Sequence, residues 1–215
     1  MVGRKMSQRF RVTGGGPVNG VVRPAGNKNA ALPMLAATVL ADGPCEITNV
    51  PRIRDVVAFL DLLSHLGASV NWTGQNSVSV DPTSIEAKRL DPELCAAIRA
   101  SILLAGPLLA KFGSVVLPPP GGDVIGRRRL DTHFQALEAL GADVTIGAQF
   151  RLDAKRLHGA DFFLDEPSVT GTENALMAAC LADGRTVLRN AATEPHVQDL
   201  ARAMVIMGGE IEGIG

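Results

Sequence analysis

Three stretches of the chain repeat apolar residues at helical spacing, and each runs into a glycine. The corners read LGA at residues 66–68, LGA at 140–142 and MGG at 207–209, with their glycines 74 and 67 residues apart. Such spacing is typical of helices with one buried face, and glycine readily ends a helix. The apolar positions are Val56, Phe59, Leu63 and Leu66; Leu130, Phe134 and Leu137; and Val197, Leu200, Met204 and Met207.

An alanine-rich segment with helical character precedes each of these helices. The segments cover residues 30–40, 96–110 and 174–181, and each is predicted to end at a glycine, Gly43, Gly113 and Gly184, spaced 70 and 71 residues apart. A short β-prone run follows each, at 46–48, 114–117 and 186–188, and alternating segments such as 68–72 with 78–80 follow the corners. The pattern predicts a unit of strand, helix, strand, helix, strand, strand.

Three such units fit residues 23–90, 91–160 and 161–215, with the last one incomplete. A single α/β sandwich with chance similarity is the alternative, but landmarks that recur in one order at a nearly constant period favour true repeats. Alanine lets the first helix of each unit approach its counterparts closely in a shared core. Pro107 predicts a kink in the second inner helix or a late start. Residues 10–12 and 20–22 predict a separate hairpin.

Composition narrows the function classes. With 46% hydrophobic residues in 215, the chain can build a globular core. Its 21 basic and 22 acidic residues leave a net charge of -1, so no overall field attracts nucleic acid or an anionic membrane. Aromatic residues make up 4% and tyrosine is absent, which leaves few stacking platforms. We therefore expect neither a nucleic-acid partner nor a membrane partner.

The cysteines and the missing motifs argue against a metal site, nucleotide hydrolases, dinucleotide enzymes and zinc proteases. Cys45, Cys95 and Cys180 are odd in number, widely spaced and without a CxxC pair, so we expect buried small side chains and no metal site. Walker, GxGxxG and HExxH motifs are absent from the sequence. No apolar run reaches the 18 or so residues of a membrane span, and the first ten residues have no signal-peptide pattern. We expect a reducing, cytoplasmic setting.

The stretch GGDVIGRRRLDTH, residues 121–133, carries the densest chemistry. Arginines beside a helix start oppose its dipole, so the run 127–129 predicts an anion site, although a solvated charged run is the alternative. Asp131 or Thr132 is suited to cap the following helix. Asp123 is either an ordinary turn residue or a general acid. In the second case desolvation must raise its pKa, while the arginines lower it.

Two further cations stand at helical segments. Lys28 and Asn29 lie where the first inner helix begins, so Lys28 is either solvated or a second anion ligand, and Asn29 a cap or a ligand. Arg99 interrupts an apolar helix, and a buried arginine needs an anionic partner. His133 and His196 are better explained as structural residues.

Together these motifs resemble the enolpyruvyl transferase family over nearly the whole chain. The segments that carry the resemblance are GNKNAALP at 26–33, RAS at 99–101, PGGDVIGRRRLDTH at 120–133, LEALGADV at 137–144, PSVTGTENALMAA at 167–179 and NAATEPHVQDLA at 190–201. The resemblance implies an α/β fold, an inside-out α/β barrel domain built from three βαβαββ repeats. It also implies that the hairpin in residues 1–22 belongs to a second domain, and that residues 23–215 form the first.

The resemblance further implies a reaction. The 3′-hydroxyl of UDP-N-acetylglucosamine adds to C2 of phosphoenolpyruvate while C3 is protonated, and phosphate then leaves, which is the first committed step of peptidoglycan synthesis. Asp123 would be the proton donor, Lys28 would hold phosphate, Asn29 the substrates, Arg99 the nucleotide sugar and Arg128 phosphoenolpyruvate. The nucleotide-sugar site would be lined by Arg128, Arg129, Leu130, Asp131, Thr132, Glu166, Pro167, Ser168 and Val169.

Three positions depart from the family's usual pattern. Most members have cysteine where this chain has Asp123, and because a carboxylate should not be alkylated like a thiolate, we expect resistance to the epoxide fosfomycin. Arg129 stands where proline is usual, which alters the rigidity of the loop. Glu166 replaces a residue that is basic in some members.

Members of the family are roughly twice as long as this chain, and the second half supplies an aspartate and several arginines to the site. We therefore expect a fragment whose parent is an enzyme, with little activity of its own. The alternatives are a half-length paralogue that binds a nucleotide sugar without catalysis, and a chain of which two copies self-associate to imitate the two-domain enzyme.

Overall fold

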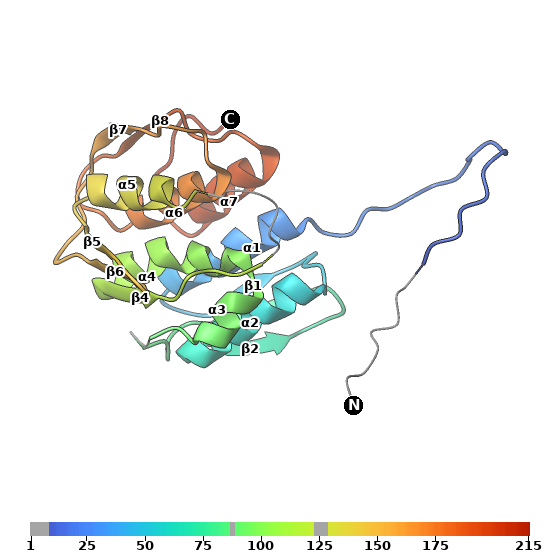
Figure 1. Cartoon of the computed structure of the whole chain (residues 1–215), viewed down its shortest axis with the longest axis horizontal. Coiled ribbons are helices and arrows are strands. Elements are labelled where there is room, and N and C mark those ends of the chain that lie inside the picture. The colour runs from blue at the N-terminus through green and yellow to red at the C-terminus, as the bar shows by residue number, and fades with distance from the viewer. Residues whose placement is uncertain (1–8, 87–88, 123–128) are drawn as a thin grey trace.

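The computed structural model describes residues 9–86, 89–122 and 129–215, and it contains three related units in chain order (Figure 1). The first unit consists of α1 (Lys28–Ala37), the 3-10 turn η1 (Thr38–Leu40), β1 (Cys45–Ile47), α2 (Arg54–Leu66), β2 (Ser69–Trp72) and β3 (Val78–Asp81). The second consists of α3 (Pro92–Ala97), the 3-10 segment η2 (Arg99–Leu104), α4 (Ala105–Phe112), β4 (Ser114–Leu117), α5 (Asp131–Ala139), β5 (Asp143–Ile146) and β6 (Phe150–Asp153). The third consists of β7 (Asp161–Phe163), α6 (Val169–Ala179), β8 (Val187–Arg189) and α7 (Pro195–Ile206).

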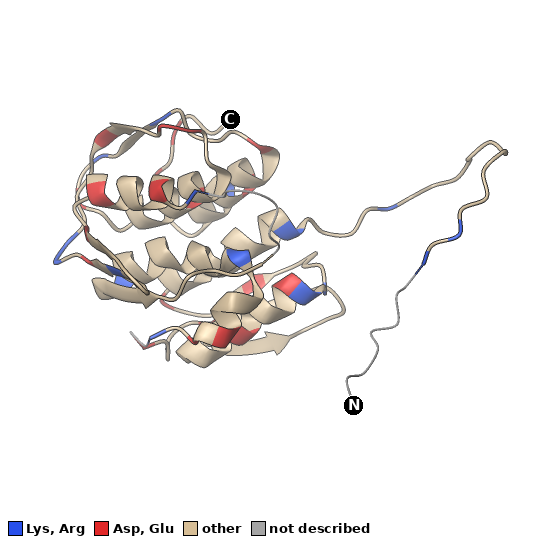
Figure 2. Cartoon of the chain, viewed as in Figure 1, with Lys and Arg blue, Asp and Glu red and all other residues tan. Residues whose placement is uncertain are grey.

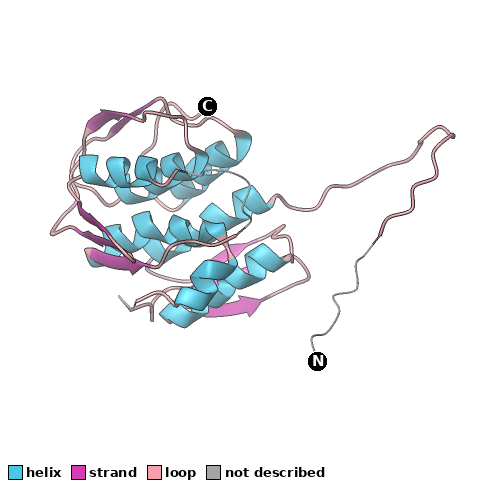
Figure 3. Cartoon of the chain, viewed as in Figure 1, coloured by secondary structure: helices cyan, strands magenta, loops and turns pink. Residues whose placement is uncertain are grey.

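The first two units each build a separate three-stranded sheet of the same topology. Their strands lie in the orders β1-β3-β2 and β4-β6-β5, with antiparallel pairing throughout. In the third unit β7 pairs with β8 in parallel. The sheets lie around a cluster of helices that pack on one another, with α6 in contact with α4, α5 and α7 (Figure 3). This arrangement matches the predicted fold of three α/β units around helices.

Glycine follows α2, α5 and α7 where the sequence predicts, whereas α1 with η1 ends at Leu40 and α6 at Ala179, before the predicted Gly43 and Gly184. Gly67 follows α2 in the left-handed conformation, with φ of 110°, and its N–H bonds to the carbonyls of the last turn. Gly141 and Gly208 have φ of 99° and 103° just beyond α5 and α7. Only glycine adopts these angles without strain, so the three corners recur for a steric reason.

The shared core is aliphatic and close-packed. Leu35 from α1, Leu63 from α2, Leu104 from η2 and Leu109 from α4 are all fully buried. They belong to one continuous cluster that reaches Met177 of α6. Burial of a leucine side chain contributes about 1.5–3 kcal/mol, so this cluster holds the three units together as one body.

The second inner helix is broken, which the prediction of one continuous helix over 96–110 missed. Ile98 is extended, residues 99–104 form a 3-10 segment, and α4 begins only at Ala105. Pro107 is the third residue of α4, where its missing N–H would have had no partner within the helix. Of the two outcomes predicted for Pro107, the structure shows the late start.

The predicted N-terminal hairpin is not formed. Residues 9–27 contain no strand, and they leave the folded body as an extended arm (Figure 1). Phe10 and Val18 in this arm are 96% and 103% exposed. An isolated two-stranded hairpin is marginally stable, so without a sheet to join these residues have no reason to pair. Among the described residues, the first two units likewise lack the predicted opening strand, whereas β7 supplies it in the third.

Candidate active site

The beginning of α1 carries the first predicted site residues. Asn27 caps the helix, with its side-chain oxygen accepting from Asn29 N–H at 2.9 Å. Lys28 is the first helical residue and forms an ion pair of 2.5 Å with Asp55 of α2. Just before the cap, a Cβ on Gly26 would lie 1.7 Å from the carbonyl oxygen of Asn49, so only glycine lets the chain enter the helix here. Lys28 is thus a half-exposed cation at a helix start.

Arg99 lies at the break in the second inner helix and beside Gly121 and Gly122. Gly121 N–H donates to the Cys95 carbonyl at 3.0 Å. A Cβ on Gly122 would lie 3.1 Å from the backbone nitrogen of Arg99. Gly121 therefore lies directly against α3, and Gly122 lies directly against the backbone of Arg99. The sequence predicted a buried arginine, and the structure places Arg99 at intermediate exposure.

Arg129 is surrounded by carboxylates. Its Nε and Nη2 both donate to Asp131, with the Nη2 bond at 2.6 Å, and Nη2 also donates to Asp165. Glu166 Oε2 lies 3.6 Å from Nη1. Hydrogen bonds from Arg129 hold the pKa of the Asp131 carboxyl below its usual range. Asp123 and Arg128, which the sequence predicts as catalytic, lie outside the described residues.

The start of α6 is joined to the start of α5. Thr132 Oγ1 donates to Glu166 Oε1 at 3.2 Å, and a Cβ on Gly171 would lie 3.3 Å from the Thr132 methyl group. Ser168 caps α6, with its Oγ accepting from Gly171 N–H at 3.2 Å. Pro167 is exposed between Glu166 and this cap. The predicted residues of segments 129–132 and 166–169 are therefore neighbours in space.

Leu130 and Val169 stand at the beginnings of α5 and α6. Leu130 is partly buried, and its carbonyl accepts from His133 N–H at 3.0 Å as α5 begins. Val169 is the first residue of α6. Neither Asp131 nor Thr132 caps α5 through its side chain, because the cap position is Leu130 and makes no such bond. The predicted side-chain cap was therefore wrong, and Asp131 instead faces Arg129.

His133 belongs to a buried polar network. Its Nδ1 lies 2.9 Å from Asn174 Nδ2 and its Nε2 lies 3.0 Å from Thr170 Oγ1. Asn174 Oδ1 accepts from Gly106 N–H at 2.7 Å, and a Cβ on Gly106 would lie 2.4 Å from the Asn174 carbonyl oxygen. Burial, together with the nearby Arg99 charge, lowers the pKa of His133 to about 4. His133 is thus a structural residue, as predicted.

Glu173 is a buried acid that the sequence analysis overlooked. The residue is 1% exposed, and its Oε1 has no hydrogen-bond partner among the described residues. Burial raises the pKa of its carboxyl to about 8, and the charge of Glu194 acts in the same direction. It lies eleven residues before Gly184, as Leu32 and Ile102 lie before Gly43 and Gly113. An acid that interrupts an apolar helix was the available signal, the same one that singled out Arg99.

The structure thus unites part of the predicted site. Arg129, Asp131, Thr132 and Glu166 are connected by hydrogen bonds or ion pairs, and Arg99 is near enough to affect His133. Among the described residues no hydrogen bond links Lys28 or Asn29 to that group, although α1 packs against η2. The partners Asp55 and Asp165 were not predicted. Asp165 had a sequence signal, since it stands directly beside Glu166.

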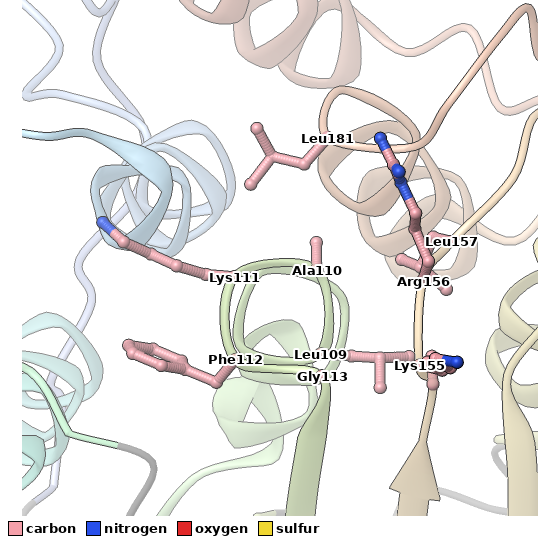
Figure 4. A pocket seen from close by; sticks show the side chains of 10 residues that line it. Leu109, Ala110, Lys111, Phe112, Gly113, Lys155, Arg156, Leu157 and Leu181 are labelled. Carbon is pink, nitrogen blue, oxygen red and sulfur yellow. The ribbon is translucent and has the colours of Figure 1, made fainter.

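A shallow pocket lies elsewhere, at the C-terminal end of α4 (Figure 4). It has a volume of about 300 Å³ and is lined by residues such as Leu109, Lys111, Arg156 and Leu181, none of them a predicted site residue. Lys111 Nζ donates to the Ala41 carbonyl at 2.6 Å, and Arg156 pairs with Asp183.

Acidic and basic residues are spread over all three units (Figure 2). Within the described part, no cluster of side chains could hold a metal ion, and no helix is long and apolar enough to cross a membrane.

Comparison with known proteins defines the class. Residues 12–215 match the family model of EPSP synthase (3-phosphoshikimate 1-carboxyvinyltransferase). The chain therefore belongs to the EPSP synthase family, whose members transfer an enolpyruvyl group.

The names of its curated relatives also specify the acceptor of the transferred group. A UDP-N-acetylglucosamine 1-carboxyvinyltransferase of Bradyrhizobium diazoefficiens is 59% identical over 207 residues, which are 96% of this chain and 48% of that protein. A protein of the same name from Treponema denticola is 50% identical over 206 residues, with the same shares covered. The chain thus spans about half the length of the curated relatives it matches.

Solved structures support the fold. The enolpyruvyl transferase NikO from Streptomyces tendae superposes with a TM-score of 0.81 at 22% identity, covering 94% of this chain and 48% of that one. EPSP synthase from Acinetobacter baumannii gives a TM-score of 0.65 at 20% identity, covering 80% and 41%. At these identities the likeness establishes the architecture, and the predicted fold class is confirmed.

Proposed function

We propose that the chain is the nucleotide-sugar domain of an enzyme that transfers the enolpyruvyl group of phosphoenolpyruvate to the 3′-hydroxyl of UDP-N-acetylglucosamine. The observation that carries this proposal is the 59% identity, over 96% of the chain, to a relative named for that transfer. The proposal places the protein in peptidoglycan synthesis in the cytoplasm, with no metal or cofactor. The adjoining starts of α5 and α6 support it, because backbone N–H groups at helix starts suit a diphosphate.

The reaction needs one proton donor and several cations. In the proposal, the sugar hydroxyl gives its proton to an aspartate of the second domain and its oxygen bonds to C2 of phosphoenolpyruvate, while Asp123 gives a proton to C3. The intermediate then returns a proton from C3 as the bond between C2 and the phosphate oxygen breaks. Lys28 and Arg128 face the charge that develops on phosphate, an electrostatic stabilisation that acts most strongly in the transition state.

The remaining predicted residues bind substrate in this proposal. Asn29 and Arg99 contact the substrates from the starts of α1 and η2. The nucleotide sugar lies along segments 128–132 and 166–169, beside the starts of α5 and α6. Since the chain spans about half of its curated relatives, we propose that alone it has little or no turnover and that a second domain completes the site.

Phosphate release tests the proposal on the longer gene product. We expect release from phosphoenolpyruvate that depends on UDP-N-acetylglucosamine, and a loss of roughly a hundredfold or more in Lys28→Ala. Arg151→Ala is the matched control, because Arg151 is an exposed cation paired with Asp153 in β6, outside the proposed site. Turnover without the sugar, or an unimpaired Lys28→Ala, would contradict the assignment. If coding sequence stops at Gly215 and the chain binds the sugar without turnover, the non-catalytic paralogue is correct.

A further inference from the structure

We propose that Arg129 is a positioning residue that braces the two walls of the nucleotide-sugar site, the start of α5 and the turn before α6. This inference rests on the proposed function. It assigns Arg129 to the scaffold of the site, where the resemblance alone had assigned it to substrate binding.

The guanidinium is already occupied by protein carboxylates. Nε and Nη2 face Asp131, Nη2 also faces Asp165, and Nη1 faces Glu166. Asp131 is the first residue of α5, whereas Asp165 and Glu166 lie between β7 and α6. One planar group therefore joins two segments that are 36 residues apart in sequence. A lysine could not make this fork, because its charge sits on a single nitrogen.

Glu166 extends the brace to the substrate-facing residues. Its Oε2 faces Arg129 while its Oε1 accepts from Thr132 Oγ1 at 3.2 Å. Its carbonyl accepts from Ser168 N–H at 2.7 Å, next to the cap of α6. The position of Arg129 is thereby coupled to Thr132 and to the N–H groups of α6. These are the groups that the proposal gives to the nucleotide.

We expect the ion pairs of Arg129 to affect the local geometry of the two segments more than the global stability of the domain. The side chains of Arg129, Asp131 and Asp165 are 36%, 48% and 40% exposed, and exposed ion pairs contribute little to global stability. Three carboxylates gather around one cation, so removal of Arg129 leaves three like charges that repel one another. We therefore expect the two walls to separate without unfolding of the domain.

The test is titration of this chain with ligands followed by amide NMR, together with amide hydrogen exchange. The ligands are UDP-N-acetylglucosamine, UDP and uridine, and the variants are Arg129→Ala and Arg129→Lys. Arg151→Ala is the control, because Arg151 also forks onto an aspartate two residues later but, among the described residues, joins no second segment. We expect Arg129→Ala to bind all three ligands roughly tenfold more weakly. We also expect faster exchange at residues 130–134 and 164–168, with Arg129→Lys in between.

Each other outcome has a distinct meaning. If Arg129→Ala weakens UDP and UDP-N-acetylglucosamine but spares uridine, Arg129 is a direct phosphate ligand and the inference is overturned. If exchange in both segments matches Arg151→Ala, there is no brace. If the unaltered chain binds none of the ligands, the proposed nucleotide-sugar site on this domain fails, whereas the exchange data still report on the brace.

Discussion

The side-chain amide of Asn174 donates to Nδ1 of His133 across 2.9 Å, and it has no freedom to do otherwise. Its oxygen is occupied by Gly106 N–H, so its nitrogen must be the group that faces the imidazole. Nδ1 is therefore the acceptor, and Nε2 carries the proton toward Thr170 Oγ1. His133 is held as one neutral tautomer.

Stability should therefore fall in acid through His133. The pKa is about 4 in the folded chain and 6.5 in the reference state, so the unfolded chain binds the extra proton first. The His133 contribution is complete above pH 6.5 and is lost as the pH falls toward 4, by about 3 kcal/mol at most. Urea unfolding at several pH values in a Glu173→Gln background measures this decline without the opposing contribution of Glu173.

The tautomer itself is testable by NMR titration of the imidazole. Asn174→Asp replaces the donor with a carboxylate, so we expect the pKa of His133 to rise by about 1–3 units. An unchanged pKa would mean that the amide does not control the imidazole.

Glu173 should make the domain less stable as the pH rises from about 4.5 to 8. Its pKa is about 8 in the folded chain and 4.5 in the reference state, so the cost of keeping it buried grows from pH 4.5 upward and is complete above pH 8. That cost is up to about 5 kcal/mol. We expect Glu173→Gln to flatten the decline between pH 5 and pH 9, measured by urea unfolding. Parallel curves for the two proteins would refute the buried acid.

Gly121 should tolerate no side chain. A Cβ there would lie 1.7 Å from the Ala96 carbonyl oxygen, so Gly121→Ala must displace the loop from α3. We expect a loss of about 1–3 kcal/mol or more in the free energy of unfolding. Gly43→Ala is the control, since nothing lies within 4 Å of its Cβ and the change should be neutral or slightly stabilising. Equal midpoints for the two variants would contradict the close approach.

Asp123 should protect the longer gene product from fosfomycin. A carboxylate is a weak nucleophile toward the epoxide, whereas the thiolate is the reactive form of cysteine. We expect no covalent adduct by mass spectrometry on the native protein and an adduct on Asp123→Cys. A time-dependent adduct on Asp123 itself would refute the prediction.

The repeats could be predicted because they rest on local physics. Gly67, Gly141 and Gly208 must end helices wherever they occur in this pattern, and one apolar face per helix fixes which side packs inward. The break in the second inner helix could not be predicted, because the surrounding alanine and leucine residues favour a helix at Ile98. Its extended conformation depends on the packing of the three units. The hairpin failed for a similar reason, since its stability depends on a sheet absent from the described residues.

The site was predicted by residue type more reliably than by partner. Cations at helix starts were visible in the sequence, and Lys28 does lie at the first position of α1. That Arg129 would face Asp165, 36 residues away, was not visible, because no local rule connects those positions. Glu173 was missed because the predicted third inner helix began at residue 174, whereas α6 begins at Val169 and includes the acid.

Gly106 has no side chain and does not touch His133, yet it determines how closely α4 approaches α6. A methyl group there would lie 2.4 Å from the Asn174 carbonyl oxygen, so any larger residue would push the two helices apart and withdraw the N–H that orients the amide. An absent side chain on one helix thus helps to fix the tautomer of a buried imidazole on another. A search for residues that orient His133 by direct contact alone would pass over Gly106.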